Sequence, residues 1–168
     1  MRELPCAILA PMQPGDEHWI ERAIELARHS VASGGGPFGA VVVRAGACIA
    51  EGQNRVTLWN DPTAHAEVVA LRAACEKLSS FQLEGCTVYS SCEPCPMCLG
   101  ALYWARPARL VFACTRADAA AVGFDDDLIY RELELPIAAR KLPTEQLARE
   151  AGLAAFVDWA RSAGKRGY

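Results

Sequence analysis

The strongest constraint on the fold of this chain comes from two motifs that are far apart in the sequence: H-x-E at residues 65–67 and P-C-x-x-C at residues 94–98. One imidazole and two thiols form a ligand set that suits zinc, so His65, Cys95 and Cys98 are predicted to meet at one metal ion. Structural zinc sites use four protein ligands, whereas catalytic sites leave one position open. Three ligands with Glu67 beside them therefore predict a catalytic Zn²⁺ site in which Glu67 moves a proton.

A second interpretation of the same motifs is a structural zinc site in a non-catalytic module. Cys92 lies close to Cys95 in the sequence and would complete a Cys₃His set. A structural site does not need the carboxylate of Glu67, whereas an enzyme does. Substitution of Glu67 by Gln separates the two interpretations, because an enzyme should lose activity while it retains zinc.

The chain contains eight cysteines, and those outside the C-x-x-C motif are expected to be reduced thiols. The N-terminal residues lack the continuous apolar segment and the small-residue cleavage site of a secretory signal, which favours a cytoplasmic protein. Three cysteines lie in apolar, strand-like runs and are expected to be small buried hydrophobic residues: Cys48, Cys86 and Cys114.

Composition narrows the class of protein. With 168 residues, 52% of them hydrophobic and 22% charged, the chain has the size of one globular domain, predicted over residues 16–168 after an N-terminal extension at 1–15. No apolar stretch reaches the roughly 20 residues of a membrane helix, so no membrane partner is expected. The net charge of −3 lacks the basic excess typical of nucleic-acid-binding proteins and favours a small-molecule partner.

Helical and extended patterns alternate along the chain up to residue 113. Asp16 is a candidate N-cap for a helix that stops at the glycine-rich segment 34–37. The apolar positions of this helix recur at helical spacing: Ile20, Ala23, Ile24, Ala27 and Val31. Further runs predict a hairpin, a helix after a polar loop, and two strands around another helix: 38–44 with 48–51, about 63–77, and 87–90 and 110–113 around 96–104. This order predicts an α/β fold with parallel pairing across the helical crossovers.

The residues that follow have a weaker pattern. A short helix is predicted at 128–133, and two amphipathic helical stretches are predicted at 144–150 and 153–163. Prolines hold the connection at 135–143 extended, which makes it a natural hinge if the C-terminal segment, about 144–168, is exchanged between subunits.

Longer segments of the chain resemble a known family. The sequences GGPFGA (35–40), NDPTAHAE (60–67), SCEPCPMC (91–98) and GFDD (123–126) are similar to those of bacterial guanine deaminases with the cytidine-deaminase fold, and the similarity extends from about residue 17 to the C-terminus. The zinc motifs themselves match the signature of zinc-dependent base deaminases. The resemblance implies a three-layer α/β/α sandwich with a mixed five-stranded sheet. It also implies a homodimer that hydrolyses guanine to xanthine and ammonia by attack at C2.

The resemblance further implies roles for residues that the pattern alone leaves ambiguous. Asn54 would read the edge of the base, Phe38 would form an apolar or stacking wall, and Asp126 would be a second carboxylate near the leaving amino group. Without the resemblance, Phe38 suits core packing, Asn54 a turn, and Asp126 a loop or helix N-cap. The implied substrate contacts are Phe38, Asn54, Ala66, Trp104, which would shape the base slot, and Tyr168, which would close it from a partner subunit.

Related enzymes leave alternatives for the substrate. Guanosine deaminases of the same fold share segments like 60–67 and 123–126 and accept a ribose, and other aminated purines are possible substrates. A tRNA adenosine deaminase would use the same zinc motifs on a flipped nucleotide. That enzyme needs basic residues for the phosphates, which the net charge of −3 disfavours.

Overall fold

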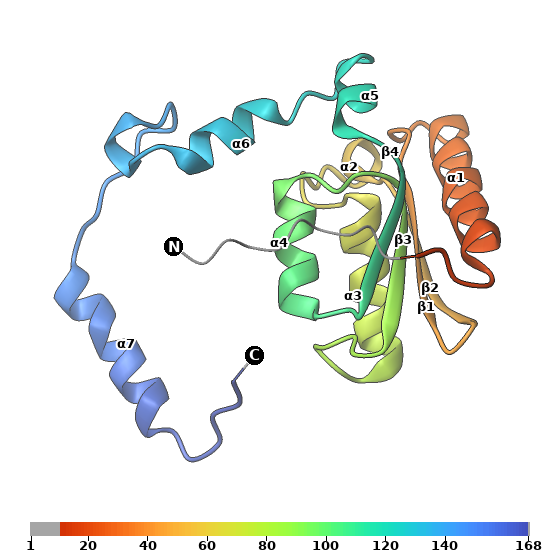
Figure 1. Ribbon diagram of the computed structural model, residues 1–168. Helices are drawn as coiled ribbons and strands as arrows, with labels where there is room; N and C mark the ends of the chain where they lie inside the picture. Colours follow the sequence, from red (N-terminus) through yellow and green to blue (C-terminus); the bar gives the residue numbers. More distant parts are fainter. Residues whose placement is uncertain (1–10, 168) are drawn as a thin grey trace.

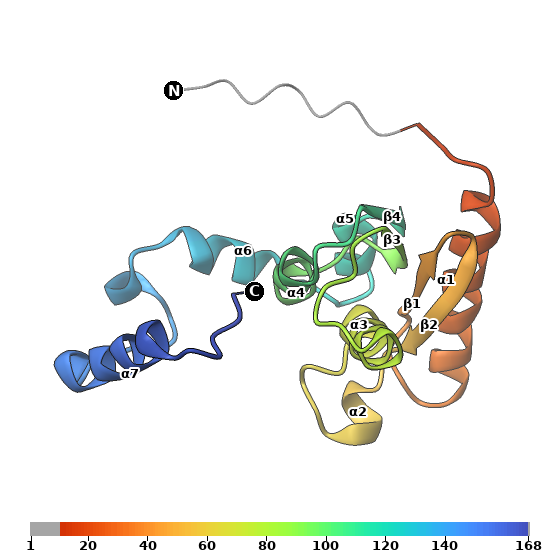
Figure 2. The same cartoon turned by 90° about the horizontal axis from the view of Figure 1, so that it is seen from below.

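The structure is a computed structural model that describes residues 11–167, and it has an α/β fold in three layers. Helix α1 (Asp16–Ala32) covers one face of the sheet, while α3 (Ala66–Leu78) and α4 (Pro96–Ala105) cover the other face (Figures 1 and 2). Separate hydrophobic clusters fill the two spaces between helices and sheet. The predicted three-layer α/β architecture is therefore confirmed.

The sheet is mixed and contains, in spatial order, β2 (Ala47–Gln53), β1 (Gly39–Arg44), β3 (Cys86–Cys92) and β4 (Arg109–Cys114). β1 pairs antiparallel with β2 and with β3, and β3 pairs parallel with β4 across the α4 crossover, as predicted. The predicted five-stranded sheet was wrong, because the described residues form four strands. The chain turns into short helices directly after β4, so it adds no strand at that edge.

β1 and β3 are buried on both faces, which explains the nearly continuous apolar sequence of β1. β3 also carries two buried serines, Ser90 and Ser91. Successive side chains of β1 alternate between the two clusters: Val42 packs on the α3 and α4 side, and Val41 packs on the α1 side. The two residues between β1 and β2, Ala45 and Gly46, both have positive φ, as a two-residue hairpin turn of type I′ requires.

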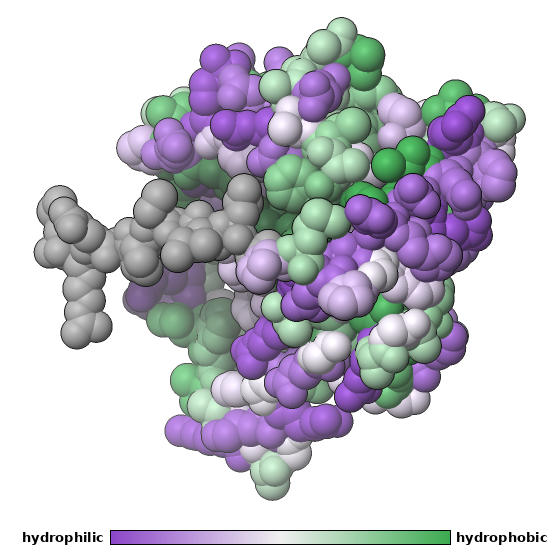
Figure 3. All heavy atoms as spheres, turned by 45° about the vertical axis from the view of Figure 1, so that its right-hand side comes forward, coloured by the Kyte–Doolittle hydropathy of each residue, from purple (hydrophilic) through white to green (hydrophobic). Residues whose placement is uncertain are grey.

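Helix α1 begins where the sequence predicts, but Asp16 is its first helical residue and Gly15 takes the N-cap position. Ile24 and Val31 are 39% and 55% exposed, so these two do not belong to the buried face. Ala23 and Ala27 are buried with two residues that the apolar pattern omitted, Leu26 and Ser30. Figure 3 shows hydrophilic residues over much of the face that carries α1, with apolar residues between them.

The chain after β4 forms an arm that projects from the sandwich (Figure 1). It contains α5 (Arg116–Ala120), α6 (Asp127–Glu134), a 3₁₀ turn (Ile137–Ala139) and α7 (Arg149–Arg161). Two helical stretches were predicted in place of α7, but one continuous helix forms, and it is preceded by Ala148 with a φ of 50°. The polar loop before α3 also contains a short helix, α2 (Val56–Trp59), that the sequence did not predict.

Two expectations on cysteines and termini are resolved only in part. Cys86 is buried and Cys48 is half-buried, but Cys114 is exposed because it ends the edge strand β4. Tyr168 and residues 1–10 of the predicted N-terminal extension lie outside the described residues. Within residues 11–167, no helix has the length and apolarity to cross a membrane.

Candidate active site

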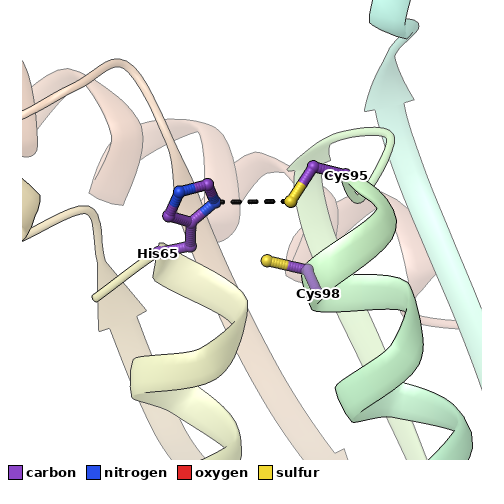
Figure 4. A group of neighbouring side chains, drawn as sticks. All are labelled: His65, Cys95 and Cys98. Atoms are coloured by element: carbon purple, nitrogen blue, oxygen red, sulfur yellow. Dashed lines mark hydrogen bonds between the residues drawn. The ribbon is translucent and has the colours of Figure 1, made fainter. Parts of the chain in front are cut away.

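Both motifs lie at the starts of helices, as predicted (Figure 4). His65 is the N-cap of α3, and Cys95 is the N-cap of α4, with Pro96 as the first helical residue. Cys98 lies in the first turn of α4, so its thiol points back toward the same end. Gly52 of β2 has no side chain because a Cβ there would collide with the carbonyl of Ala66, so the start of α3 packs directly on the sheet.

The three predicted ligands form a group that could hold one metal ion. The donor atoms of His65, Cys95 and Cys98 lie within 4.8 Å of one another. Zinc bonds of about 2.0 Å to nitrogen and about 2.3 Å to sulfur span roughly this separation. The imidazole and thiol donors suit zinc, and three protein ligands leave a coordination position open, as in catalytic sites. The residues present therefore fit a catalytic zinc ion.

The thiols of this group are coupled to each other. The hydrogen bond from Cys98, the largest cause, and that from His65 together outweigh burial and lower the pKa of Cys95 to about 4. The Sγ of Cys95 lies 3.5 Å from Nδ1 of His65. The pKa of Cys98 is raised, first by its hydrogen bond to Cys95 and then by burial. A stable thiolate at Cys95 favours metal binding, because metals bind the deprotonated thiol.

Cys92 does not join this group, although it was the candidate for a fourth ligand. Its thiol donates to the carbonyl of Thr115 at 3.5 Å, and burial raises its pKa to about 11. Within the described residues, the group contains His65, Cys95 and Cys98. The alternative Cys₃His structural site therefore has no support from the geometry.

A cavity of about 560 Å³ opens beside two of the three ligands, His65 and Cys95. Its lining includes His65, Cys95 and Glu67 together with three of the predicted substrate-site residues, Phe38, Asn54 and Asp126. The volume is within the range of small-molecule sites. Two other predicted residues do not reach this lining, namely Ala66, which is fully buried in the core, and Trp104, which is 60% exposed.

Asn54 is held in one orientation at the wall of the cavity. It is 6% exposed, and its Oδ1 accepts hydrogen bonds from the backbone N–H groups of Gly36 and Val56, each at 3.3 Å. The hydroxyl of the buried Ser30 donates to the backbone carbonyl of Asn54 at 2.9 Å. Because its Oδ1 accepts hydrogen bonds from the backbone, the side chain of Asn54 presents its NH₂ group, a hydrogen-bond donor, to a ligand.

Two carboxylates of the cavity have perturbed acidity. Burial is the main cause that raises the pKa of Glu67, which is 4% exposed. Burial also raises the pKa of Asp126, the half-buried N-cap of α6, and the charge of Cys95 adds to this effect. Carboxyl groups with raised pKa values suit proton transfer near neutral pH.

The structure adds two cavity residues for which no role was predicted. The ring of Phe124 packs edge-on against Phe38, with centroids 5.0 Å apart and planes at 89°. Phe124 belongs to the GFDD segment, which was the available signal in the sequence. Arg116 also lines the cavity and lies over the ring of Tyr130, 4.7 Å from its centroid. Nothing in the sequence pattern marked Arg116.

Zinc-dependent deaminases share the features of this site. One imidazole and two thiols lie at the starts of two helices that pack on a mixed sheet, and a buried carboxylate lies beside them. Residues 14–114 match the cytidine and deoxycytidylate deaminase zinc-binding region. The chain belongs to this family.

Similar proteins extend the match beyond these residues. A guanine deaminase of Bacillus subtilis is 52% identical over 153 residues, which cover 90% of this chain and 98% of that protein. The crystal structure of a Bacillus subtilis guanine deaminase superposes with a TM-score of 0.89 and 51% identity over 94% of this chain and 99% of that chain. A tRNA-specific adenosine deaminase of Haemophilus influenzae is 40% identical over 71% of this chain and 73% of that protein.

Proposed function

We propose that this protein is a zinc-dependent guanine deaminase that hydrolyses guanine to xanthine and ammonia. The observation that carries the proposal is the group of three zinc-binding atoms, within 4.8 Å of one another, that lies beside Glu67 at a cavity. The choice of guanine is supported by the 52% identity to a guanine deaminase, which covers 98% of that enzyme.

We assign the metal to His65, Cys95 and Cys98. When bound, zinc supplies a Lewis acid that brings the pKa of water to about 7. Glu67 accepts a proton from the attacking water and transfers it to a ring nitrogen next to C2 of guanine. Its burial, which keeps water away from the transfer, and its raised pKa suit this role.

The other side chains of the cavity bind the base and assist the leaving group. Asn54 donates hydrogen bonds to an acceptor on the edge of guanine, and Phe38 and Phe124 form an apolar wall against the ring. Asp126 accepts hydrogen bonds from the exocyclic amine and relays to it the remaining proton of the attacking water. The water oxygen bonds to C2 and becomes its carbonyl oxygen as that proton is removed, the bond from C2 to the amine breaks, and ammonia leaves.

We further propose that the enzyme is a homodimer in which the C-terminal arm of one subunit packs on the other. The arm projects from the sandwich in Figures 1 and 2 and exposes large apolar side chains. Leu133, Leu142, Leu147, Phe156 and Trp159 are between 51% and 82% exposed. A second copy that covers these side chains would remove apolar surface from water. In the proposed dimer, Tyr168 of one subunit and the surface residue Trp104 would lie near the cavity of the other subunit.

The proposed reaction is tested by ammonia release from guanine, guanosine, adenosine and cytidine with zinc-loaded protein. Turnover of guanine with little or no turnover of the other three is the expected result. Efficient turnover of guanosine would replace the proposal with a nucleoside deaminase. If none of the four reacts, the substrate is a different amine or a nucleotide within RNA, and the proposal is wrong.

The proposed dimer is tested by the mass of the protein in solution and by a truncated chain. A chain that ends before Lys165 should fold and remain dimeric through α7, but it should lose most of its activity because Tyr168 is missing. A full-length protein that is monomeric and fully active would contradict the proposed arrangement.

A further inference from the structure

Glu67 has one hydrogen-bond donor on the sheet, the hydroxyl of Ser90. Ser90 lies in β3 and is 1% exposed, and its Oγ is 3.2 Å from Oε1 of Glu67. An ionised carboxylate only accepts hydrogen bonds, so the hydroxyl is the donor. The contact joins β3, one of the two inner strands of the sheet, to the first turn of α3, in which Glu67 is the second helical residue and His65 is the N-cap.

The second oxygen of Glu67 faces the metal-binding group. Oε2 lies 3.5 Å from Sγ of Cys98, so the two carboxylate oxygens have separate neighbours. Within residues 11–167, Glu67 forms no ion pair with a lysine or an arginine. A neutral donor therefore holds the side chain from one side without a permanent opposite charge.

We propose that Ser90 is a positioning residue for the reaction: its hydroxyl holds Oε1 of Glu67 so that Oε2 stays aligned between the attacking water and the substrate. The inference rests on the proposed function, in which Glu67 transfers the proton. The Ser90 hydroxyl contacts Oε1, whereas Oε2 lies beside Cys98 of the metal-binding group, so the hydrogen bond fixes the direction of the carboxylate.

The neighbouring residue supplies a matched control. Tyr89 precedes Ser90 on β3 and points to the opposite face of the sheet, where its hydroxyl donates to Asp16 at 2.7 Å. The hydroxyls of Tyr89 and Ser90 thus each donate a hydrogen bond to a buried carboxylate, but of these two carboxylates only Glu67, the partner of Ser90, lines the cavity. Tyr89→Phe removes a hydroxyl–carboxylate bond with no change near Glu67.

The experiment measures kcat and KM for guanine, together with the melting temperature, for Ser90→Ala, Ser90→Thr and Tyr89→Phe. For Ser90→Ala we expect kcat to fall about 10- to 100-fold while KM changes less than about threefold, because a misplaced acid–base group costs rate rather than binding. Ser90→Thr keeps the donor and should stay within about threefold of the parent. Tyr89→Phe should lower the melting temperature and leave kcat at the parent value.

A double-mutant cycle separates positioning from a general loss of structure. In the Glu67→Gln background, Ser90→Ala should lower the residual kcat less than about threefold, because the group that it positions is already absent. An equal fall in both backgrounds would overturn the inference, as would a parent-like kcat for Ser90→Ala. A parent protein that leaves guanine unchanged overturns the proposed function and this inference with it. An active parent with an unaffected Ser90→Ala variant overturns the inference alone.

Discussion

Two buried carboxylates lie on opposite faces of the same sheet and have opposite surroundings. Asp16, 3% exposed on the α1 face, accepts hydrogen bonds from Arg109 at 2.6 and 2.8 Å and from Tyr89 at 2.7 Å. Glu67, 4% exposed on the α3 face, has the Ser90 hydroxyl at 3.2 Å and the Cys98 thiol at 3.5 Å.

The pKa values of the two carboxyl groups move in opposite directions. The Arg109 guanidinium holds the pKa of Asp16 well below its usual range, whereas burial raises the pKa of Glu67. A carboxylate such as Asp16, which forms an ion pair with an arginine and accepts several hydrogen bonds, stays charged and stabilises the fold. A carboxylate that is buried without a cation can gain and lose a proton, which is what the proposed reaction requires.

The largest expected difference between the two faces follows removal of zinc. Chelation should abolish the turnover of guanine, and added Zn²⁺ should restore it, because the reaction depends on the Lewis acid. The ion pair of Asp16 and Arg109 lies on the opposite face of the sheet and should remain intact. The metal-free protein should therefore still unfold in one cooperative transition. Full activity of a protein shown to be metal-free would contradict the assignment of the site.

Asp16→Asn should produce the largest loss of stability without a loss of chemistry. The change leaves the Arg109 guanidinium, 14% exposed, without its anionic partner. Breaking a buried ion pair in this way costs about 3–5 kcal/mol of unfolding free energy. Urea unfolding measures the loss, and kcat of the folded protein at low temperature should equal that of the parent. Unchanged stability would show that the pair does not hold α1 to β4.

Asp126→Asn tests a third carboxylate, one that is half-buried at the cavity rather than inside the fold. We expect kcat for guanine to fall about 10- to 100-fold and KM to rise less than kcat falls, because the relay of a proton to the amine is lost and most base contacts remain. Steady-state kinetics at saturating guanine separates the two effects. Equal kcat values for variant and parent would remove Asp126 from the mechanism.

The smallest expected effect is a pH dependence of stability that belongs to Asp16. Its pKa is lowered in the folded protein relative to about 3.9 in the unfolded chain, so its stabilisation is complete above pH 5. As the pH falls below about 4 toward the folded-state pKa, the stabilisation is progressively lost. The difference in unfolding free energy between the parent and Asp16→Asn should therefore shrink from pH 6 to pH 2. A constant difference would contradict the origin of the shift.

The sequence predicts the metal-binding group of His65, Cys95 and Cys98 well, because the signals for these residues lie in short local motifs. The H-x-E and C-x-x-C motifs each sit at a helix start, and the helical and extended patterns around them are strong enough to locate both helices. The four observed strands were also evident from their apolar runs. The proposed substrate-site roles of Asn54 and Asp126 came instead from the family resemblance.

The features that the sequence did not predict depend on contacts between segments that are far apart in the chain. Asp16 was assigned to a helix cap because its partner, Arg109, follows 93 residues later and no local pattern joins them. Ser90 is one of several polar residues in a buried strand, and only the fold shows that it faces Glu67. The helices after β4 replaced the implied fifth strand, because alanine-rich and amphipathic segments carry no β pattern.

The most direct test of the central claim compares Glu67→Gln with the parent enzyme at equal zinc content. The amide has nearly the shape of the carboxylate but cannot transfer the proton. We expect kcat for guanine to fall by about 10²- to 10⁴-fold while zinc content and the melting temperature stay at parent values. A zinc-loaded Glu67→Gln protein that deaminates guanine at the parent rate would contradict the account, because Glu67 would then be only a buried structural residue.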